Sequence, residues 1–220
     1  MKTKYSQIRE DREINLLIEK GNEILGVLGF TEHSRRHAAK TAETAAMILK
    51  ELGYKKHKIE LAKIAGYMHD IGNSINRHDH AHSGAILAYD ILRRREMDLE
   101  DVLTVTAAIG HHDELTGHSV DEVSAALILA DKTDVRRNRV QNPDRKNFDI
   151  HDRVNYAALA SQVTVDRERR VIQMTLQLDD RYCSLVDYFE IFLERMIMCR
   201  RAAEQLNCRF KLTANGSKLL

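Results

Sequence analysis

The 220-residue sequence contains three cysteines, one proline, no tryptophan and no long apolar run. The cysteines (Cys183, Cys199 and Cys208) are odd in number and lack a C-x-x-C spacing, which argues against a disulfide framework or a zinc ribbon. No apolar stretch approaches the roughly eighteen residues that span a bilayer, and the N-terminus lacks the apolar core of a signal peptide. We therefore expect a cytoplasmic protein with reduced thiols.

An excess of charge of either sign is also absent. Lys and Arg number 34 and Asp and Glu 33, a formal net charge of +1, so no global field favours nucleic acid or an anionic membrane. The arginine-rich stretches 93–95 and 136–139 are more simply solvated faces near helix ends. We therefore expect no membrane partner and no nucleic-acid partner.

Helical periodicity dominates the first two thirds of the chain. The predicted helices cover residues 11–28, 31–52, 56–70, 80–97, 99–111 and 120–140. Thr31 is a candidate cap for the second helix, which Gly53 closes. The stretch Ala125–Ala130 is apolar on all sides and predicts a central, buried helix.

The composition changes after about residue 140. Residues 141–152 are polar, include Pro143 and predict a connection. Alternating patterns then predict strands over 160–165 and 171–178, an amphipathic helix over 184–207 and a closing strand over 210–212. We predict a mainly α protein, with a helical domain over residues 1–150 and a small α+β subdomain of ββαβ order over residues 151–220. The apolar stripe of its helix is expected to serve as core or as a homodimer interface.

The most informative residues are His69 and Asp70, which end an apolar helical pattern and precede Ile71 and Gly72. An imidazole and a carboxylate are costly to bury without a partner, and a metal ion is the usual partner. Further candidate ligands are spread along the chain: His37, His80, His111, His112 and Asp131. This set exceeds what one tetrahedral zinc needs and predicts two metal ions bridged by Asp70.

Simpler interpretations exist for each candidate taken alone. His37 could be an ordinary half-buried helix histidine, and Asp131 a helix-surface carboxylate. His82 cannot share the helix face of His80 and is better explained as an exposed residue. His111 and His112 point about 100° apart, so both reach metal only if the helix end frays or two ions are present.

The order His37, His69-Asp70, Asp131 resembles the HD-domain superfamily of metal-dependent phosphohydrolases, and His69-Asp70-Ile71-Gly72 matches its HDIG variant. Residues 80–85 (HAHSGA) are similar to the H-x-x-x-G-A segment of HD-GYP phosphodiesterases and of HD-type diadenosine tetraphosphate hydrolases. Residues 109–114 (IGHHDE) are similar to the paired histidines of HD-GYP proteins. The resemblance covers about residues 30–140, and none is found for residues 153–220.

The resemblance implies a helical HD-domain bundle that cleaves a phosphate ester or phosphoanhydride, expected in a nucleotide, with metal-activated water. The implied ligands of the first ion are His37, His69, Asp70 and Asp131; those of the second are Asp70, His80, His112 and, less directly, His111. Mn or Fe suits such a mixed site best, with Zn, Co, Ni and Mg as alternatives.

Two departures from the relatives bear on the substrate. Asn73 stands where they carry a lysine after HDIG, and Thr116-Gly117-His118 stands where HD-GYP proteins carry Gly-Tyr-Pro, which counts against cyclic di-GMP. A phosphate-binding cation could come instead from Lys132, from Arg137, which ranks at best equal to Lys132, or from Arg77 or Arg136. A helical wheel through residue 140 points Lys132 away from Asp131.

Two other functions are compatible with the same ligands. Some HD-fold proteins use a di-iron pair for oxygen-dependent C–C or C–P cleavage. A metal-binding regulatory module without catalysis is the other alternative.

Overall fold

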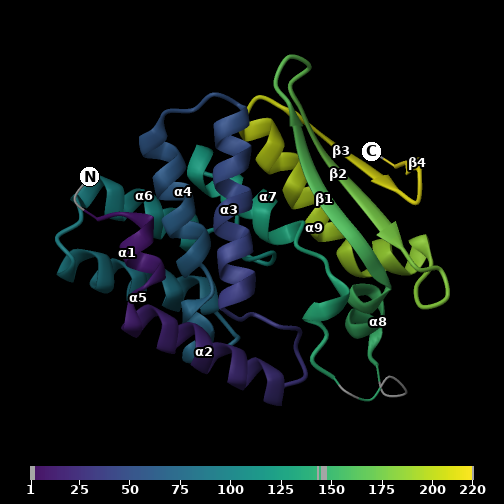
Figure 1. Ribbon diagram of the computed structural model, residues 1–220, viewed down its shortest axis with the longest axis horizontal. Coiled ribbons are helices and arrows are strands. Elements are labelled where there is room, and N and C mark those ends of the chain that lie inside the picture. The colour runs from purple at the N-terminus through teal and green to yellow at the C-terminus, as the bar shows by residue number, and fades with distance from the viewer. Residues whose placement is uncertain (1–2, 143, 145–147, 220) are drawn as a thin grey trace.

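The computed structural model describes residues 3–142, 144 and 148–219, so Pro143 lies outside the described residues. Within that part of the chain, the first two thirds fold into helices (Figure 1). They are α1 (Tyr5–Arg9), α2 (Arg12–Val27), α3 (Arg35–Glu51), α4 (Lys56–Met68), the 3-10 turn η1 (Ile71–Ser74), α5 (His80–Arg94), α6 (Leu99–Gly110) and α7 (Glu122–Lys132). The predicted mainly helical fold is confirmed.

Two predicted helix ends are wrong. The side chain of Ser34 accepts a hydrogen bond from the Arg36 N–H, so Ser34 rather than Thr31 caps α3. Helix α7 ends at Lys132 instead of residue 140, and the hydroxyl of Thr133 donates to the Leu129 carbonyl at this end. A separate 3-10 turn, η2 (Arg137–Arg139), follows after a short irregular segment.

Helix α7 lies at the centre of the molecule. Every side chain from Val123 to Ala130 is at most 1% exposed, as its continuous apolar sequence predicts. Asp121 caps the helix, because its side chain accepts the Ser124 N–H while the Ser124 hydroxyl accepts the Asp121 N–H. The buried helix thereby holds its polar C-terminal residues at a fixed place among α3, α4 and α6.

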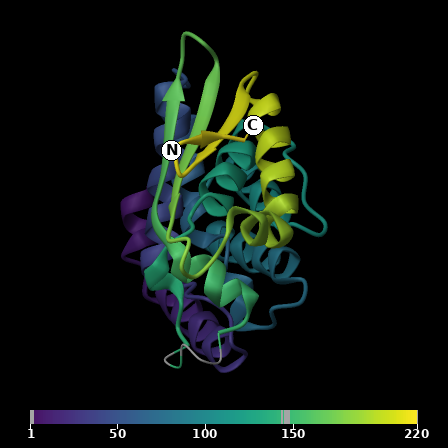
Figure 2. The same cartoon turned by 90° about the vertical axis from the view of Figure 1, so that its right-hand side faces the viewer.

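The last third forms a small α+β unit (Figure 2). Its elements are α8 (Ile150–Ala157), β1 (Ala158–Asp166), β2 (Val171–Leu178), α9 (Leu185–Gln205), β3 (Arg209–Ala214) and β4 (Ser217–Lys218). The sheet order is β1-β2-β3-β4; β2 and β3 are parallel, and the other pairs are antiparallel. The predicted ββαβ order is confirmed, whereas α8, β4 and the short α1 were not predicted.

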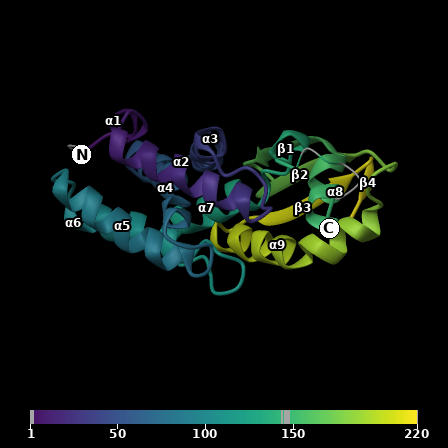
Figure 3. The same cartoon turned by 90° about the horizontal axis from the view of Figure 1, so that it is seen from below.

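Helix α9 connects the sheet to the helical part. It contacts α7 as well as β3, and it lies along one face of the sheet (Figure 3). Residues Ile172, Met174 and Leu176 of β2 are buried on that face, while Thr175 and Gln177 are exposed on the other. Side chains from both parts join a single apolar core, so the division after residue 150 stays a prediction.

Among the described residues, no helix combines the length and the apolar character needed to cross a membrane.

Candidate metal centre

Six of the predicted ligands meet in one buried cluster at the ends of five helices. His37 lies in the first turn of α3, His69 and Asp70 follow α4, His80 begins α5, His112 follows α6, and Asp131 lies in the last turn of α7. The first five are at most 5% exposed, and Asp131 is partly buried. Tertiary packing therefore brings together residues up to 94 positions apart in the sequence.

A glycine allows α3 and α4 to approach closely at this point. A Cβ added to Gly66 would lie 2.7 Å from the Ala42 Cα, so no larger residue fits without a shift. The Gly66 carbonyl also accepts a hydrogen bond from His69 Nδ1 at 2.9 Å. This contact places the His69 ring beside His37, with 3.3 Å between their Nε2 atoms.

The four histidines in the cluster each present Nε2 to its centre. His69, His80 and His112 donate from Nδ1 to the carbonyl three residues earlier, at 2.6–3.1 Å. His37 Nδ1 contacts Asp134 Oδ2 at 2.8 Å. Because a carbonyl or carboxylate oxygen accepts the Nδ1 proton, the neutral ring carries a lone pair on Nε2, the arrangement found in metal-binding histidines.

These lone pairs face one another and two carboxylates. The Nε2 atoms of His80 and His112 are 3.1 Å apart, and the Arg77 guanidinium lies 3.3 Å from His80 Nε2. Asp131 Oδ1 lies 3.2 Å from His37 Nε2. Acceptors at such distances repel unless a proton or a metal ion lies between them.

Asp70 faces two halves of the cluster: the first half contains His37 and His69, and the second half contains His80 and His112. Its Oδ2 atom lies 3.0 Å from His69 Nε2 and 3.6 Å from His37 Nε2. Its Oδ1 atom lies 3.6 Å from His80 Nε2 and 3.8 Å from His112 Nε2. Oδ2 is buried and makes no hydrogen bond in the described part of the chain, so it is available to a cation.

The charges in the first half also favour a cation. Burial opposes a charge on His69, but Asp70 and Asp131 outweigh it and raise the pKa of His69 to about 10. Burial alone would raise the pKa of both carboxyls. The charges of His69 on Asp70 and of Lys132 on Asp131 instead hold both pKa values well below their usual range. Two buried carboxylates thus remain ionised and require positive charge.

The imidazole rings of His80 and His112 are uncharged. Burial and the neighbouring His112 lower the pKa of His80 to about 3, and burial likewise lowers the pKa of His112. Both rings are therefore neutral at physiological pH, which is the state in which imidazole binds a metal.

The donor set fits a divalent metal. Three overlapping triads have their ligand atoms within 4.8 Å of one another: His37-His69-Asp70, His69-His112-Asp131 and Asp70-His80-His112. Bonds from transition metals to such ligands are about 2.0–2.2 Å, so atoms this close can share an ion with small adjustments. The cavity beside them holds about 20 Å³, room for roughly one ion or water.

Cations surround this cavity. Its lining beyond the ligands consists of Thr31, His33, Arg77, Glu114, Lys132, Arg139 and Arg195. Burial opposes the charge on Lys132, but Asp131 and Glu114 raise its pKa above the usual value, so it stays protonated. Lys132 Nζ lies 2.8 Å from Asp131 Oδ2. The expectation that Lys132 points away from Asp131 is therefore wrong, because the long Lys132 side chain brings its ammonium group back to the Asp131 carboxylate.

Two predicted site residues, His111 and Arg137, lie away from the cluster. Helix α6 ends at Gly110 and directs His112 inward, while His111 lines a separate surface groove between α5 and α6. His82 lines that groove too and is exposed, as expected. Arg137 donates from Nε to the Tyr156 carbonyl and lies 4.4 Å over the Tyr156 ring, because the chain turns after α7.

Sequence reasoning missed His33, Glu114, Arg139 and Arg195 as lining residues. His33 resembles the ligand histidines in one structural feature, since its Nδ1 donates to a backbone carbonyl, that of Thr31, at 2.6 Å. Glu114 lies in the connection after α6, at the end of the segment 109–114 that contains the paired histidines. Arg139 and Arg195 reach the cavity from η2 and α9, and no local motif marks them.

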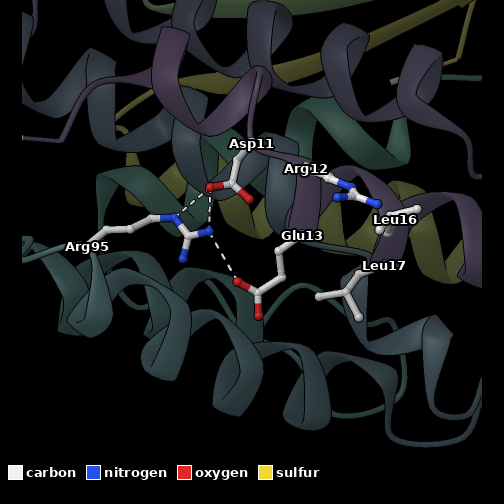
Figure 4. Close-up of a pocket in the computed structure, with 6 residues that line it drawn as sticks. All are labelled: Asp11, Arg12, Glu13, Leu16, Leu17 and Arg95. Carbon is white, nitrogen blue, oxygen red and sulfur yellow. Dashed lines mark hydrogen bonds and ion pairs between the residues drawn. The ribbon is translucent and has the colours of Figure 1, made fainter.

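A larger groove of about 610 Å³ lies between α2 and the end of α5 (Figure 4). Three of its charged residues pair with one another: Arg95 contacts Asp11 at 2.7 Å and Glu13 at 3.2 Å. None of the predicted ligands lines it, so the smaller cavity remains the candidate site.

Comparisons with known proteins identify relatives of this chain. An uncharacterised protein of Methanocaldococcus jannaschii is 26% identical over 201 residues, which cover 80% of this chain and 76% of that protein. Ribonuclease Y of Thermosipho melanesiensis is 27% identical over 168 residues, which cover 72% of this chain. The match covers 32% of that enzyme, so the chain corresponds to about a third of it.

A solved structure, a predicted HD superfamily hydrolase from an uncultured Thermotogales bacterium, shares 26% identity with a TM-score of 0.44. The match covers 57% of this chain and 68% of the chain in the solved structure. The model of the HD domain family matches residues 35–154, more than half of the chain and all six residues of the cluster. The chain therefore belongs to the HD domain family.

Proposed function

We propose that this protein is a metal-dependent phosphohydrolase that cleaves a phosphate ester or phosphoanhydride of a nucleotide. One observation carries the proposal: four histidine Nε2 atoms and two ionised carboxylates converge in a buried cluster, beside a cavity lined by cations. The ligands favour a divalent metal, and the cations favour an anionic substrate.

The proposed centre holds two ions, one on each side of Asp70. His37, His69, Asp131 and Asp70 Oδ2 would hold the first; His80, His112 and Asp70 Oδ1 would hold the second. Ions bound there would supply Lewis-acid polarisation of the phosphoryl group and activation of water. Lys132 and Arg77 are placed to offset negative charge on the phosphoryl oxygens.

The metal and the substrate are proposed from chemistry. A mixed histidine and carboxylate set suits Mn or Fe best, with Zn, Co, Ni and Mg as alternatives. A small phosphorylated substrate is proposed, because the cavity is narrow. Phosphodiesters of RNA belong to the same bond class, and the name of the relative ribonuclease Y makes them worth including in a test.

The test is a substrate panel with purified protein loaded with Mn²⁺. It would include nucleoside mono-, di- and triphosphates, dinucleotides and short oligoribonucleotides, with product release measured by chromatography. His80→Ala and His82→Ala form a matched pair on one helix, because His80 lies in the cluster and His82 is exposed. We expect His80→Ala and Asp70→Ala to retain less than about a tenth of the wild-type rate, a loss above 1.4 kcal/mol, and His82→Ala to match wild type.

Absence of metal-dependent cleavage across the panel would overturn the proposal. Oxygen consumption by the iron-loaded protein, without phosphate release, would favour the di-iron oxygenase instead. Equal activity of His80→Ala and His82→Ala would remove the cluster from the reaction.

A further inference from the structure

A carboxylate lies between two cations beside the metal centre. Glu114, in the connection from α6 to α7, contacts Arg195 Nε at 2.6 Å and Lys132 Nζ at 3.5 Å through the same oxygen, Oε1. All three residues line the cavity that contains Asp70 and Asp131. Arg195 comes from α9, so the C-terminal α+β unit contributes a charged side chain to this cavity.

The Arg195 side chain is held in place. Its guanidinium carbon lies 4.3 Å from the centre of the Phe192 ring, one turn earlier on α9, and Phe192 is 1% exposed. The Arg195 side chain is itself only 24% exposed. A guanidinium fixed on an aromatic face loses little freedom when it binds an anion, and its planar donors match phosphate oxygens.

Glu114 stands where an anionic group of a substrate would fit. Its Oε1 accepts from a guanidinium and lies near an ammonium group, and the same pair of donors suits a phosphoryl oxygen. Lys132 also lies 2.8 Å from Asp131, a predicted metal ligand, so a group held by this pair would lie beside the metal centre. Arg77 and Arg139 add positive charge to the same lining.

The geometry points to Arg195 and Lys132 as the residues that bind the substrate phosphoryl group, with Glu114 as a placeholder that the phosphoryl group displaces. This inference rests on the proposed function and gives the C-terminal unit a role in substrate binding. No covalent bond is made or broken in the exchange. The phosphoryl group replaces the Glu114 carboxylate as the anion that pairs with Arg195 and Lys132.

The test is binding of inorganic phosphate to the Mn²⁺-loaded protein, measured by isothermal titration calorimetry without any turnover. Arg195→Ala should weaken phosphate binding about tenfold, as loss of a charge-assisted hydrogen bond implies, and Arg195→Lys should weaken it less. Glu114→Gln should tighten it about threefold or more, because a competing negative charge is removed. Arg200→Ala, an exposed arginine on the same helix, should match wild type.

A separate titration with Mn²⁺ alone should give the same metal affinity for wild type and for both Arg195 variants. The opposite signs expected for Arg195 and Glu114 separate the inference from a structural role. Weaker phosphate binding in Glu114→Gln would overturn it, and so would unchanged binding in Arg195→Ala. If Arg195→Ala does not fold, Arg195→Lys and Glu114→Gln decide the question.

The two proposals fail in different ways. A protein that shows both phosphate effects but cleaves nothing in the panel overturns the proposed function only. A protein that hydrolyses its substrate while Arg195→Ala binds phosphate normally overturns this inference only.

Discussion

At the scale of single residues, Asp134 orients a ligand although it does not face the metal cavity. It accepts a hydrogen bond from His37 Nδ1 and is held by Arg136 at 2.7 Å and 2.8 Å and by Arg139. This chain of contacts fixes the tautomer and orientation of the His37 ring. Hydrogen bonds from His37 and Arg136 outweigh burial and hold the pKa of Asp134 far below its usual range.

We therefore expect Asp134→Asn to weaken Mn²⁺ binding by about 10- to 100-fold, the usual effect of removing such a partner. Calorimetric titration with Mn²⁺ measures the affinity, and far-UV circular dichroism checks that the variant folds. Asp90→Asn, an exposed carboxylate on α5, is the matched control. A folded Asp134→Asn protein with wild-type affinity would show that Asp134 does not position His37.

At the scale of elements, the contact of α3 with α4 sets the spacing of His37 and His69. Gly66 permits this contact, since an added Cβ would lie within 3.1 Å of the backbone at Thr41 and Ala42. Gly26 in α2 differs, because an added Cβ there meets only the side chain of Gln141, at 3.4 Å or more.

Gly66→Ala should therefore lower the free energy of unfolding by about 1–3 kcal/mol through overpacking, and should weaken Mn²⁺ binding as the helices separate. Gly26→Ala should leave the stability unchanged or raise it by up to about 1 kcal/mol. Urea unfolding measures both variants. Equal stability of the two would contradict the close contact between α3 and α4.

Asp179, directly after β2, connects several elements. It accepts hydrogen bonds from Arg181 and from Arg137 of η2, and its backbone N–H donates to the Ala157 carbonyl at the end of α8. The Arg181 side chain, and to a lesser extent Arg137, hold the pKa of Asp179 below its usual value of 3.8.

A carboxyl whose pKa is lowered in the folded state stabilises the protein above the unfolded pKa, and this contribution is lost as pH falls through the folded pKa. We therefore expect Asp179→Asn to lower the melting temperature near neutral pH. The difference from wild type should shrink as pH falls below about 4. A difference that is the same at all pH values would contradict the ion-paired role of Asp179.

The elements also show what sequence reasoning could and could not predict. The predicted ranges of α2, β2 and α9 agree with the structure within one or two residues, because apolar periodicity and capping residues are local signals. Helix α8 was missed because it is short and begins inside the polar segment 141–152, which favours a connection. The end of α7 was missed because residues 133–140 offer no proline or glycine stop signal.

The candidate site likewise contains residues that the sequence predicts and residues that it does not. The six clustered ligands lie at helix ends within a recognisable order, so the sequence predicted them. Arg139 and Arg195 could not be predicted, because only the packing of η2 and α9 against the helical part brings them to the cavity. Glu114 was missed although it follows the ligand His112 by two residues.

At the scale of the whole molecule, α9 joins the sheet and the helical part into one core. Its buried residues Phe192, Met196 and Cys199 belong to the same apolar cluster as Leu127 and Leu129 of α7. A shared core of this kind favours joint unfolding, because neither part can expose its side of the contact without cost.

We expect urea unfolding to show a single transition, with coincident midpoints by far-UV circular dichroism and by tyrosine absorbance. The seven tyrosines provide the second signal in a protein without tryptophan. Two separate transitions would instead support independent domains over residues 1–150 and 151–220.

The central claim is that Asp70 bridges two metal ions held by two groups of ligands. An anomalous difference map from crystals grown with Mn²⁺ tests it most directly. We predict two peaks, one among His37, His69 and Asp131 and the other between His80 and His112, each about 2.0–2.3 Å from a different oxygen of Asp70. A single peak, or peaks that leave Asp70 without contact, would contradict the account.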